Sequence, residues 1–274
     1  MLPGKHHCLK VEKIEPKGAW LVGDEQKLLL PQAECPPQLS PGSELDVFVY
    51  LDRNNQLTAT TRTPLAEVGQ FALLQVTSIG PHGAFLNWGL EKDLLAPFSE
   101  QPQRMLEGRR YLVYLCHDQQ NRPIASARLE KYLQKENEDL REGEEVELTI
   151  WAFTDLGAKV IINNRYEGLL YKDELPPGLK RGDQGVGFVA RIRDDRRIDV
   201  SLRRPGAAGI ADAREVILEA LERNHGFLPL HDGSSPEQIR NELGLSKKQF
   251  KKAIGGLYKE GRVSLSHKGI KQLN

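Results

Sequence analysis

The segment Gly83-Ala84-Phe85-Leu86 and the run Asp93-Leu94-Leu95-Ala96-Pro97 that follows it decide the fold, because this pair occurs three times in the chain. The other two copies are Gly18-Ala19-Trp20-Leu21 with Leu28-Leu29-Leu30-Pro31, and Gly157-Ala158-Lys159-Val160 with Gly168-Leu169-Leu170-Tyr171. Each copy belongs to a unit of about 60 residues, and repetition on that scale is typical of tandem domains. The sequence therefore predicts three consecutive domains of one architecture.

Each unit has the pattern of five short β-strands. Residues 71–79 alternate between positions that can face a core and positions that can face solvent, which is the period of a strand. The Gly-Ala step suits a bend or bulge, and the polar stretches 52–55 and 118–121 suit the turn before the last strand. Five strands with such corners fit a small closed barrel of the OB type, which leaves no exposed sheet edge.

Two further motifs identify a family. The closing triplets Ser126-Ala127-Arg128 and Ser201-Leu202-Arg203, with the looser Thr60-Thr61-Arg62, complete a pattern that resembles the S1 domain. Residues 93–100 and 166–174 are similar to runs in the conserved virulence factor B family, and this resemblance extends from about residue 5 to 271. It implies RNA binding and a regulatory role in gene expression.

A different pattern follows Pro205–Gly209, which we expect to be a short linker. Ser235 precedes a proline at the first helical position, and Ser246 precedes a second run with helical spacing, so both are expected N-caps. The expected elements are helices over residues 212–224, 236–243 and 247–260 and strands over residues 262–265 and 269–273. This order predicts a helix-turn-helix with a β-hairpin wing.

The expected fold is therefore mainly β with a C-terminal α/β module: three tandem five-stranded OB-type barrels followed by a winged helix-turn-helix. The expected boundaries are residues 1–64 for a divergent first barrel, 65–138 for the second, 139–205 for the third and 206–274 for the winged helix.

Positive charge is concentrated near the end of the chain, although the formal net charge is zero. Residues 243–274 hold eight basic residues and the single acidic Glu260, a net charge of +7. A phosphate backbone responds to such local fields and not to the total charge. The predicted contacts in this region are Lys247, Lys248, Lys251, Lys252 and Lys259 on one helix face, with Arg262 and Lys268 on the wing. Gly255 and Gly256 on that helix permit a close neighbour.

The S1 resemblance implies that aromatic side chains on the barrels stack on RNA bases. The candidate stacking residues are Phe85, His82, Trp20 and Tyr171. Packing inside the barrels is the alternative for Phe85 and Trp20. The candidate basic contacts of the third barrel are Lys159, Arg191, Arg193 and Arg197, for which the alternative is an ordinary solvated surface. The first barrel is net acidic, so it is a candidate spacer or protein-contact domain.

Single-stranded RNA is therefore the expected partner, with ribosome or transcript-associated proteins as further candidates. The alternatives are a DNA-binding transcription regulator that acts through the winged helix and a protein-interaction scaffold. We expect no enzyme, cofactor or metal site, because the chain has no metal-ligand spacing, nucleophile elbow or phosphate-binding glycine loop. We also expect a cytoplasmic location without membrane contact, since no apolar run reaches about 18 residues. The three cysteines, Cys8, Cys35 and Cys116, are expected to be free thiols.

Overall fold

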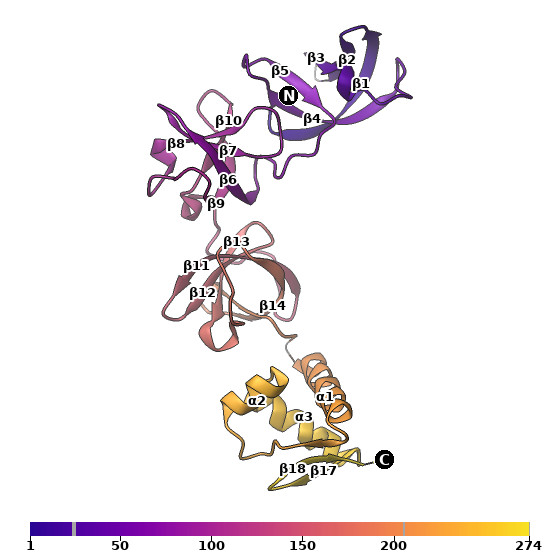
Figure 1. Cartoon of the computed structure of the whole chain (residues 1–274), viewed down its shortest axis with the longest axis vertical. Helices are drawn as coiled ribbons and strands as arrows, with labels where there is room; N and C mark the ends of the chain where they lie inside the picture. Colours follow the sequence, from indigo (N-terminus) through magenta and orange to yellow (C-terminus); the bar gives the residue numbers. More distant parts are fainter. Residues whose placement is uncertain (24–25, 205, 274) are drawn as a thin grey trace. The chain divides into compact units, whose positions relative to one another are not determined.

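The computed structural model describes residues 1–23, 26–204 and 206–273, and the side chains of residues 206–212 are outside the description (Figure 1). The chain forms two compact units, one made mainly of residues 1–134 and the other mainly of residues 135–274. Three five-stranded β domains in sequence are followed by a helical domain with a small sheet, which confirms the predicted fold class. No described helix is long and apolar enough to cross a membrane.

The first domain contains a strongly curled sheet with the strand order β3-β2-β1-β4-β5. Its strands are β1 (Lys5–Glu15), β2 (Gly18–Gly23), β3 (Gln26–Pro31), β4 (Glu44–Leu51) and β5 (Leu57–Thr60). The described backbone pairing stops at β3 and β5, where the Thr58 hydroxyl donates to the Leu29 carbonyl at 2.9 Å. A side-chain hydrogen bond thus joins the two edges that pair through their backbones in the other two domains.

The second domain is a closed barrel with the strand order β10-β8-β7-β6-β9. Its strands are β6 (Phe71–Ile79), β7 (Gly83–Asn87), β8 (Leu94–Pro97), β9 (Arg110–His117) and β10 (Pro123–Ser126). Alternate residues of β6, among them Leu74 and Val76, are buried as the period of two predicts. The residues that β7 places inward are Ala84 and Leu86, so Phe85 faces outward.

The third domain repeats the closed barrel with the order β11-β12-β13-β15-β14. Its strands are β11 (Glu145–Thr154), β12 (Gly157–Ile162), β13 (Tyr166–Tyr171), β14 (Gln184–Ile192) and β15 (Ile198–Ser201). The three domains share the neighbour relations of the OB barrel, in which the first strand pairs with both the second and the fourth. The glycine that begins the second strand is required by space, because a Cβ on Gly157 would lie 2.1 Å from the Leu170 carbonyl oxygen.

In each barrel, the closing triplet forms hydrogen bonds with the short turn that follows the third strand. A short 3-10 turn follows the third strand in each repeat, at η1 (Gln32–Glu34), η2 (Phe98–Glu100) and η4 (Lys172–Glu174). The glutamate that ends each turn accepts a hydrogen bond from the hydroxyl of the triplet: Glu34 from Thr60, Glu100 from Ser126 at 2.5 Å, and Glu174 from Ser201 at 2.6 Å. The same hydroxyl accepts from the backbone N–H of the triplet's arginine. A remaining short turn, η3 (Leu129–Lys131), follows the second triplet.

The first barrel has a hydrophobic core of its own and also packs against the core of the second barrel. Phe48 and Tyr50 of β4 pack with the buried core of the second barrel, and Phe48 meets Trp88 edge-on with ring centroids 5.6 Å apart. The ring of His117 is 2.7 Å from the Pro3 carbonyl oxygen, which adds a polar link between the same two domains. Because apolar surface is buried at this junction, the two barrels form one packed body.

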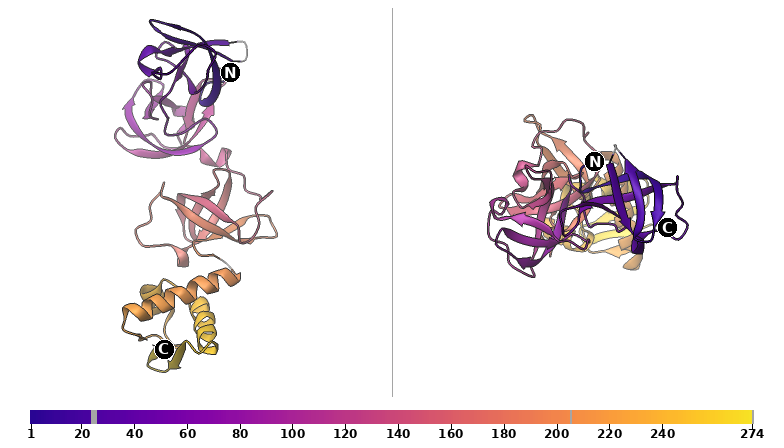
Figure 2. Two further views of the ribbon diagram at one scale, coloured as in Figure 1. Left: turned by 90° about the vertical axis from the view of Figure 1, so that its right-hand side faces the viewer. Right: turned by 90° about the horizontal axis from the view of Figure 1, so that it is seen from above.

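The C-terminal domain has the predicted helix-turn-helix and wing. Its elements are α1 (Gly206–Arg223), β16 (Phe227–Leu228), α2 (Pro236–Leu243), α3 (Lys247–Lys259), β17 (Val263–Ser266) and β18 (Gly269–Gln272). Both serine caps form capping boxes, and Gly244 ends α2 with a φ of 64°. Helix α1 packs against α3, as Figure 1 and the left view of Figure 2 show.

Two local expectations for this domain are wrong. Residues 206–209 begin α1 and are not a linker, because two alanines follow Gly206 and favour the helix; Pro205 lies outside the described residues. Strand β16, which adds a third strand to the wing, is too short to leave a pattern in the sequence.

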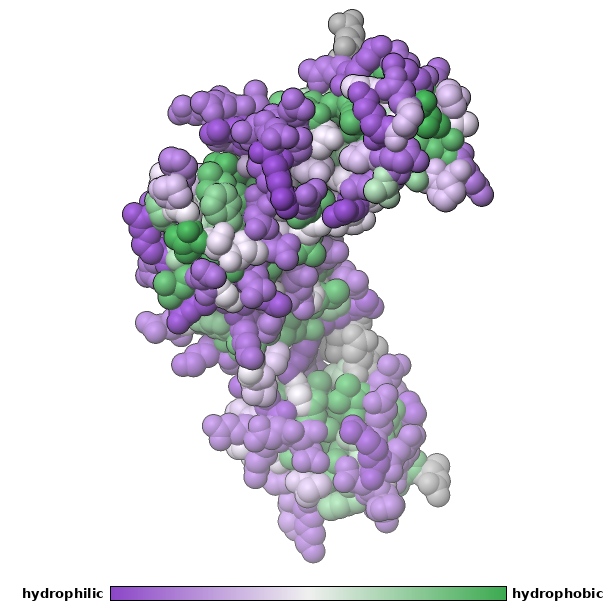
Figure 3. Space-filling model, turned by 45° about the horizontal axis from the view of Figure 1, so that its top comes forward, coloured by the Kyte–Doolittle hydropathy of each residue, from purple (hydrophilic) through white to green (hydrophobic). Residues whose placement is uncertain are grey.

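On the face drawn in Figure 3, hydrophilic side chains predominate and hydrophobic ones appear in separate patches.

Candidate nucleic-acid interface

The outer face of the second barrel contains a hollow of about 320 Å³ beside Phe85. Phe85 is half-buried and His82 is exposed, and both line this hollow. Phe85 lies directly across the sheet from Leu95, which is also half-buried and lines the same hollow. A phenyl ring beside a leucine gives a flat apolar surface of the kind on which a base can stack. Packing inside the barrel is therefore excluded for Phe85.

Arg122 and Lys92 supply positive charge to the hollow, and the carboxylate of Asp93 also lines it. Arg122 follows the turn before β10, where its Nε donates to the Asp118 carboxylate at 2.8 Å. Burial would raise the pKa of Asp118, but hydrogen bonds from the backbone and side chain of Arg122 outweigh it and lower that pKa. The carboxylate thus stays charged and holds the guanidinium at the rim.

The first barrel contributes to this hollow as well. Leu51 and Asn55, from the hairpin between β4 and β5, line it together with the residues of the second barrel. The Lys92 ammonium donates to the Asn55 side-chain oxygen at 2.7 Å and to the Asp52 carbonyl at 2.8 Å. Burial lowers the pKa of Lys92, which is consistent with an ammonium enclosed between two domains. These contacts show only that the hairpin of the first barrel lines the hollow, and the roles of this barrel as a spacer or a protein-contact domain stay predictions.

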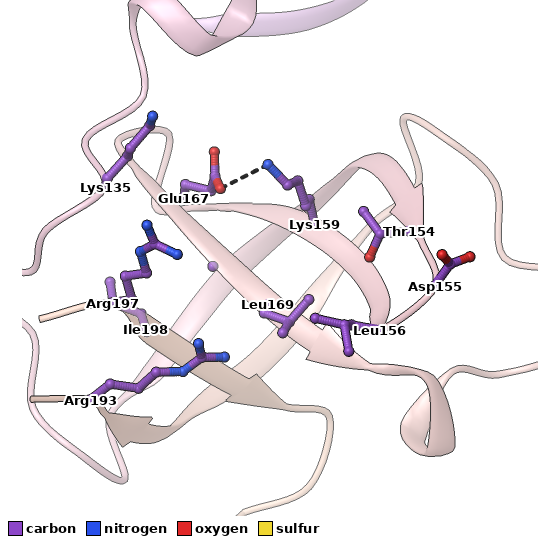
Figure 4. Close-up of a pocket in the computed structure, with 11 residues that line it drawn as sticks. Lys135, Thr154, Asp155, Leu156, Lys159, Glu167, Leu169, Arg193, Arg197 and Ile198 are labelled. Carbon is purple, nitrogen blue, oxygen red and sulfur yellow. Dashed lines mark ion pairs between the residues drawn. The ribbon is translucent and has the colours of Figure 1, made fainter. Parts of the chain in front are cut away.

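The third barrel has an equivalent hollow of about 350 Å³ (Figure 4). Leu156, Leu169 and Ile198 form its apolar part. Four basic side chains surround them: Lys135, Lys159, Arg193 and Arg197. Lys159 pairs with Leu169 across the sheet, as Phe85 pairs with Leu95. The hollow therefore occupies the same face in both barrels, but charge replaces the aromatic ring in the third.

Three of the four basic groups of this hollow are paired with carboxylates. Lys159 lies 3.1 Å from Glu167, Arg193 2.5 Å from Asp199, and Arg197 3.4 Å from Asp195. The Asp199 hydrogen bonds raise the pKa of Arg193. Pairs as exposed as that of Arg197 and Asp195 contribute little to stability, so they can be exchanged for phosphate contacts.

The remaining predicted residues of the third barrel lie outside the hollow. Tyr171 is 38% exposed, and its hydroxyl accepts a hydrogen bond from Arg193 at 3.0 Å. Arg191 is exposed and does not line the hollow. In the turn before β15, Arg193 occupies the position of Asp118, since both close the hairpin with a backbone hydrogen bond four residues on. The third barrel thus has an arginine where the second barrel has Asp118.

Trp20 is the equivalent of Phe85 in the first barrel and is half-buried, which also excludes a core position. Its indole N–H donates to Glu15 at 2.8 Å, and the Lys17 ammonium lies 4.9 Å from the ring centroid. Hydrogen bonds from Lys13 and Trp20 lower the pKa of Glu15. The ring is therefore already engaged on one side by a cation.

The winged helix places its predicted basic residues at the surface. Lys248, Lys251, Lys252 and Lys259 of α3 are exposed and Lys247 is half-buried. Arg262 and Lys268 of the hairpin are exposed as well. The opposite face of α3 is buried through Phe250, Ala253, Ile254 and Leu257. Lys251 lies 3.0 Å from Asp232, and both side chains of this pair are well exposed.

The side-chain oxygen of Gln249 is bound at the start of α3. It accepts hydrogen bonds from the backbone N–H of Ser246 at 3.2 Å and from the Ser246 hydroxyl at 2.8 Å. These bonds form the capping box of α3. Gln249 is the one amide side chain on this helix that could recognise a base in a groove. Its oxygen instead stabilises the first turn of the helix.

Sequence reasoning missed several residues of these surfaces. Leu95 and Leu169 belong to apolar runs, and only the register shows that they face outward. Asn55 and Lys92 come from different domains, and Lys135 lies in a connecting segment. No local pattern marks these residues, because tertiary packing brings them to the two hollows.

Comparisons with known proteins agree with this architecture. A model of the S1 domain matches residues 3–62, and a model of the CvfB-like winged helix domain matches residues 215–271. Neither is an enzyme family, and both domain types are nucleic-acid-binding modules.

The relatives cover almost the whole chain. The chain is 26% identical to the Bacillus subtilis protein YitL over 275 residues, which is 96% of this chain and 91% of the relative. It is 26% identical to conserved virulence factor B of Staphylococcus haemolyticus over 262 residues, which is 90% of this chain and 88% of the relative. A crystal structure of a multidomain protein with nucleic acid binding domains from Streptococcus pneumoniae is 23% identical, with a TM-score of 0.43 and coverage of 99% and 98%. With a segment similar to the S1 domain and one similar to the CvfB-like winged helix domain, the chain resembles the conserved virulence factor B proteins over most of its length.

Proposed function

We propose that this protein binds single-stranded RNA with low sequence specificity, without catalysis, and acts in the regulation of gene expression in the cytoplasm. The hollow beside Phe85 carries the proposal. It combines an outward aromatic ring, an apolar leucine opposite and two cationic side chains. A base needs the first two features and a phosphate needs the third.

The lysine face of α3 supports the same proposal. Lysines make point contacts with phosphate and carry little sequence information, which favours low specificity. Bases are accessible for stacking in a single strand, whereas in a duplex they are stacked on one another. The regulatory role rests on the resemblance to the conserved virulence factor B proteins. Ribosome or transcript-associated proteins remain candidate partners.

Charge reversal on α3 tests the proposal. Lys247→Glu combined with Lys251→Glu should weaken binding of a labelled single-stranded RNA by at least about tenfold and should reduce the slope of log K against log salt. The matched control reverses two exposed arginines of the second barrel away from its hollow, Arg109→Glu with Arg110→Glu. Both pairs change the total charge equally. Equal loss in the two variants would mean that only net charge matters, and unchanged affinity in the α3 variant would refute the role of this helix.

A further inference from the structure

Gly255 occupies the centre of the lysine face of α3. With about 100° per residue and Lys247 at 0°, the five lysines span about 0° to 140° and Gly255 lies at about 80°. A Cβ built on Gly255 would meet no heavy atom within 4 Å. At the middle of this basic surface, the helix backbone therefore has no side chain at residue 255 and open space beside it.

Packing does not account for this glycine. Glycine inside a helix is less favourable than alanine, so it usually indicates that something approaches the backbone closely. The adjacent Gly256 has such a neighbour, because a Cβ there would lie 2.1 Å from the Arg214 guanidinium. The sequence prediction of a close neighbour is thus confirmed at Gly256, while at Gly255 the corresponding space is open.

Tyr258 stands next to this open position. Its side chain is 57% exposed, and at about 20° on the helix it lies within the lysine arc. Residues three and four positions apart are neighbours on a helix surface, so Gly255 is bordered by Lys251, Lys252, Tyr258 and Lys259. Helical side chains lean toward the N-terminus, which directs Tyr258 and Lys259 toward the bare backbone.

The composition of this surface differs from that of a helix that reads the major groove. Groove-reading helices present arginine, asparagine or glutamine to base edges, whereas the amide of Gln249 is bound in the capping box of α3. A bare backbone, an exposed ring and lysines suit a strand whose sugar-phosphate chain can approach closely and whose bases are unpaired.

We propose that α3 is a single-strand binding surface: the sugar-phosphate backbone lies against Gly255, its phosphates contact Lys251, Lys252 and Lys259, and one base stacks on Tyr258. This inference rests on the proposed function and names the part of α3 that distinguishes a single strand from a duplex.

The first test adds one methyl group. In the full-length chain, Gly255→Ala should leave the unfolding temperature unchanged or raise it, because alanine favours the helix and the space is open. It should weaken binding of a single-stranded 15-nucleotide RNA about five- to tenfold. Gly185→Ala, at another open glycine in β14, is the matched control and should not change binding. Affinity within twofold of the unmodified chain, or a lower unfolding temperature, would overturn the role of Gly255.

The second test removes the ring. Tyr258→Ala should weaken binding of the same RNA at least about fivefold without changing the salt slope, and Tyr258→Phe should rescue it. Binding of a duplex DNA of equal length should be unaffected by Tyr258→Ala. Equal losses for RNA and duplex would identify α3 as a groove-binding helix and contradict the inference. If these variants bind normally while Lys247→Glu with Lys251→Glu does not, this inference fails and the proposed function stands.

Discussion

At the scale of single residues, strand register decides which side chains are available to a partner. Phe85 faces outward because Ala84 and Leu86 are both fully buried, and a slip of one residue would reverse all three. Trp20 has the same register but carries a cation on one face. The equivalent positions thus differ in what they offer, and Phe85 is the more accessible stacking surface.

Removing the ring of Phe85 tests its role. Phe85→Ala should weaken single-stranded RNA binding roughly 5- to 150-fold, the effect of 1–3 kcal/mol of lost stacking, and should leave the salt slope unchanged because no charge is removed. The measurement is fluorescence anisotropy at several salt concentrations. Phe153→Ala is the matched control, since Phe153 is 50% exposed and lines neither hollow. Equal effects of the two substitutions would remove Phe85 from the site.

Asn55 tests whether the first barrel takes part. Its φ of 59° favours glycine as the replacement, so Asn55→Gly removes the side chain without straining the hairpin. We expect weaker RNA binding, because the variant loses a side chain that lines the hollow and that accepts a hydrogen bond from Lys92. Asn121→Gly, at the corresponding hairpin position of the second barrel with a φ of 58°, should bind normally. Normal binding by both variants would confine the site to the second barrel.

At the scale of elements, a hydrogen bond from the hydroxyl of the closing triplet to the glutamate of the 3-10 turn recurs in all three barrels. Burial would raise the pKa of Glu100, but hydrogen bonds from Ser126 and Lys131 outweigh it and lower that pKa. A carboxylate with a lowered pKa stabilises the fold above its ordinary pKa of about 4.3, and this stability is lost as the pH falls through the folded pKa. The hydrogen bond between Ser126 and Glu100 in the second barrel should therefore weaken below about pH 4.

Removing the donor hydroxyl measures this contribution. Ser126→Ala should reduce the free energy of unfolding at pH 7 by about 1.5–3 kcal/mol, the range for a hydrogen bond to a charged group. The difference from the unmodified chain should shrink as the pH falls through the lowered pKa of Glu100 and this carboxylate becomes protonated. Urea unfolding followed by the fluorescence of the buried Trp88 reports on this unit, with the exposed Ser78→Ala as control. A difference that grows on acidification would contradict the assignment.

The sequence predicts elements better than sites. The alternation of apolar and polar residues and the N-caps Ser235 and Ser246 are local features of the sequence. The strands of the three barrels and the helices α2 and α3 could therefore be predicted from it. The start of α1 was missed because the glycines at its beginning resemble a linker. Asn55 could not be assigned to a site, since only the packing of Phe48 and Tyr50 against the second barrel brings its hairpin to the hollow.

At the scale of the whole molecule, binding capacity is spread over several surfaces. The proposed function assigns separate contacts with a single strand to the hollows of the second and third barrels and to the lysine face of α3. Linked weak sites bind a common strand more tightly than any one of them does alone. The zero net charge of the chain is compatible with this function because the cations are local, and most of those in the third barrel are held by carboxylates.

The most direct test is the salt dependence of binding by the full-length chain to a single-stranded RNA and to a duplex DNA of the same length. We predict that log K for RNA falls linearly with log salt, with a slope of about −0.7 for each phosphate contacted, and that RNA binds more tightly than the duplex at every salt concentration. Binding that is independent of salt, or a duplex that binds more tightly than the single strand, would contradict the account.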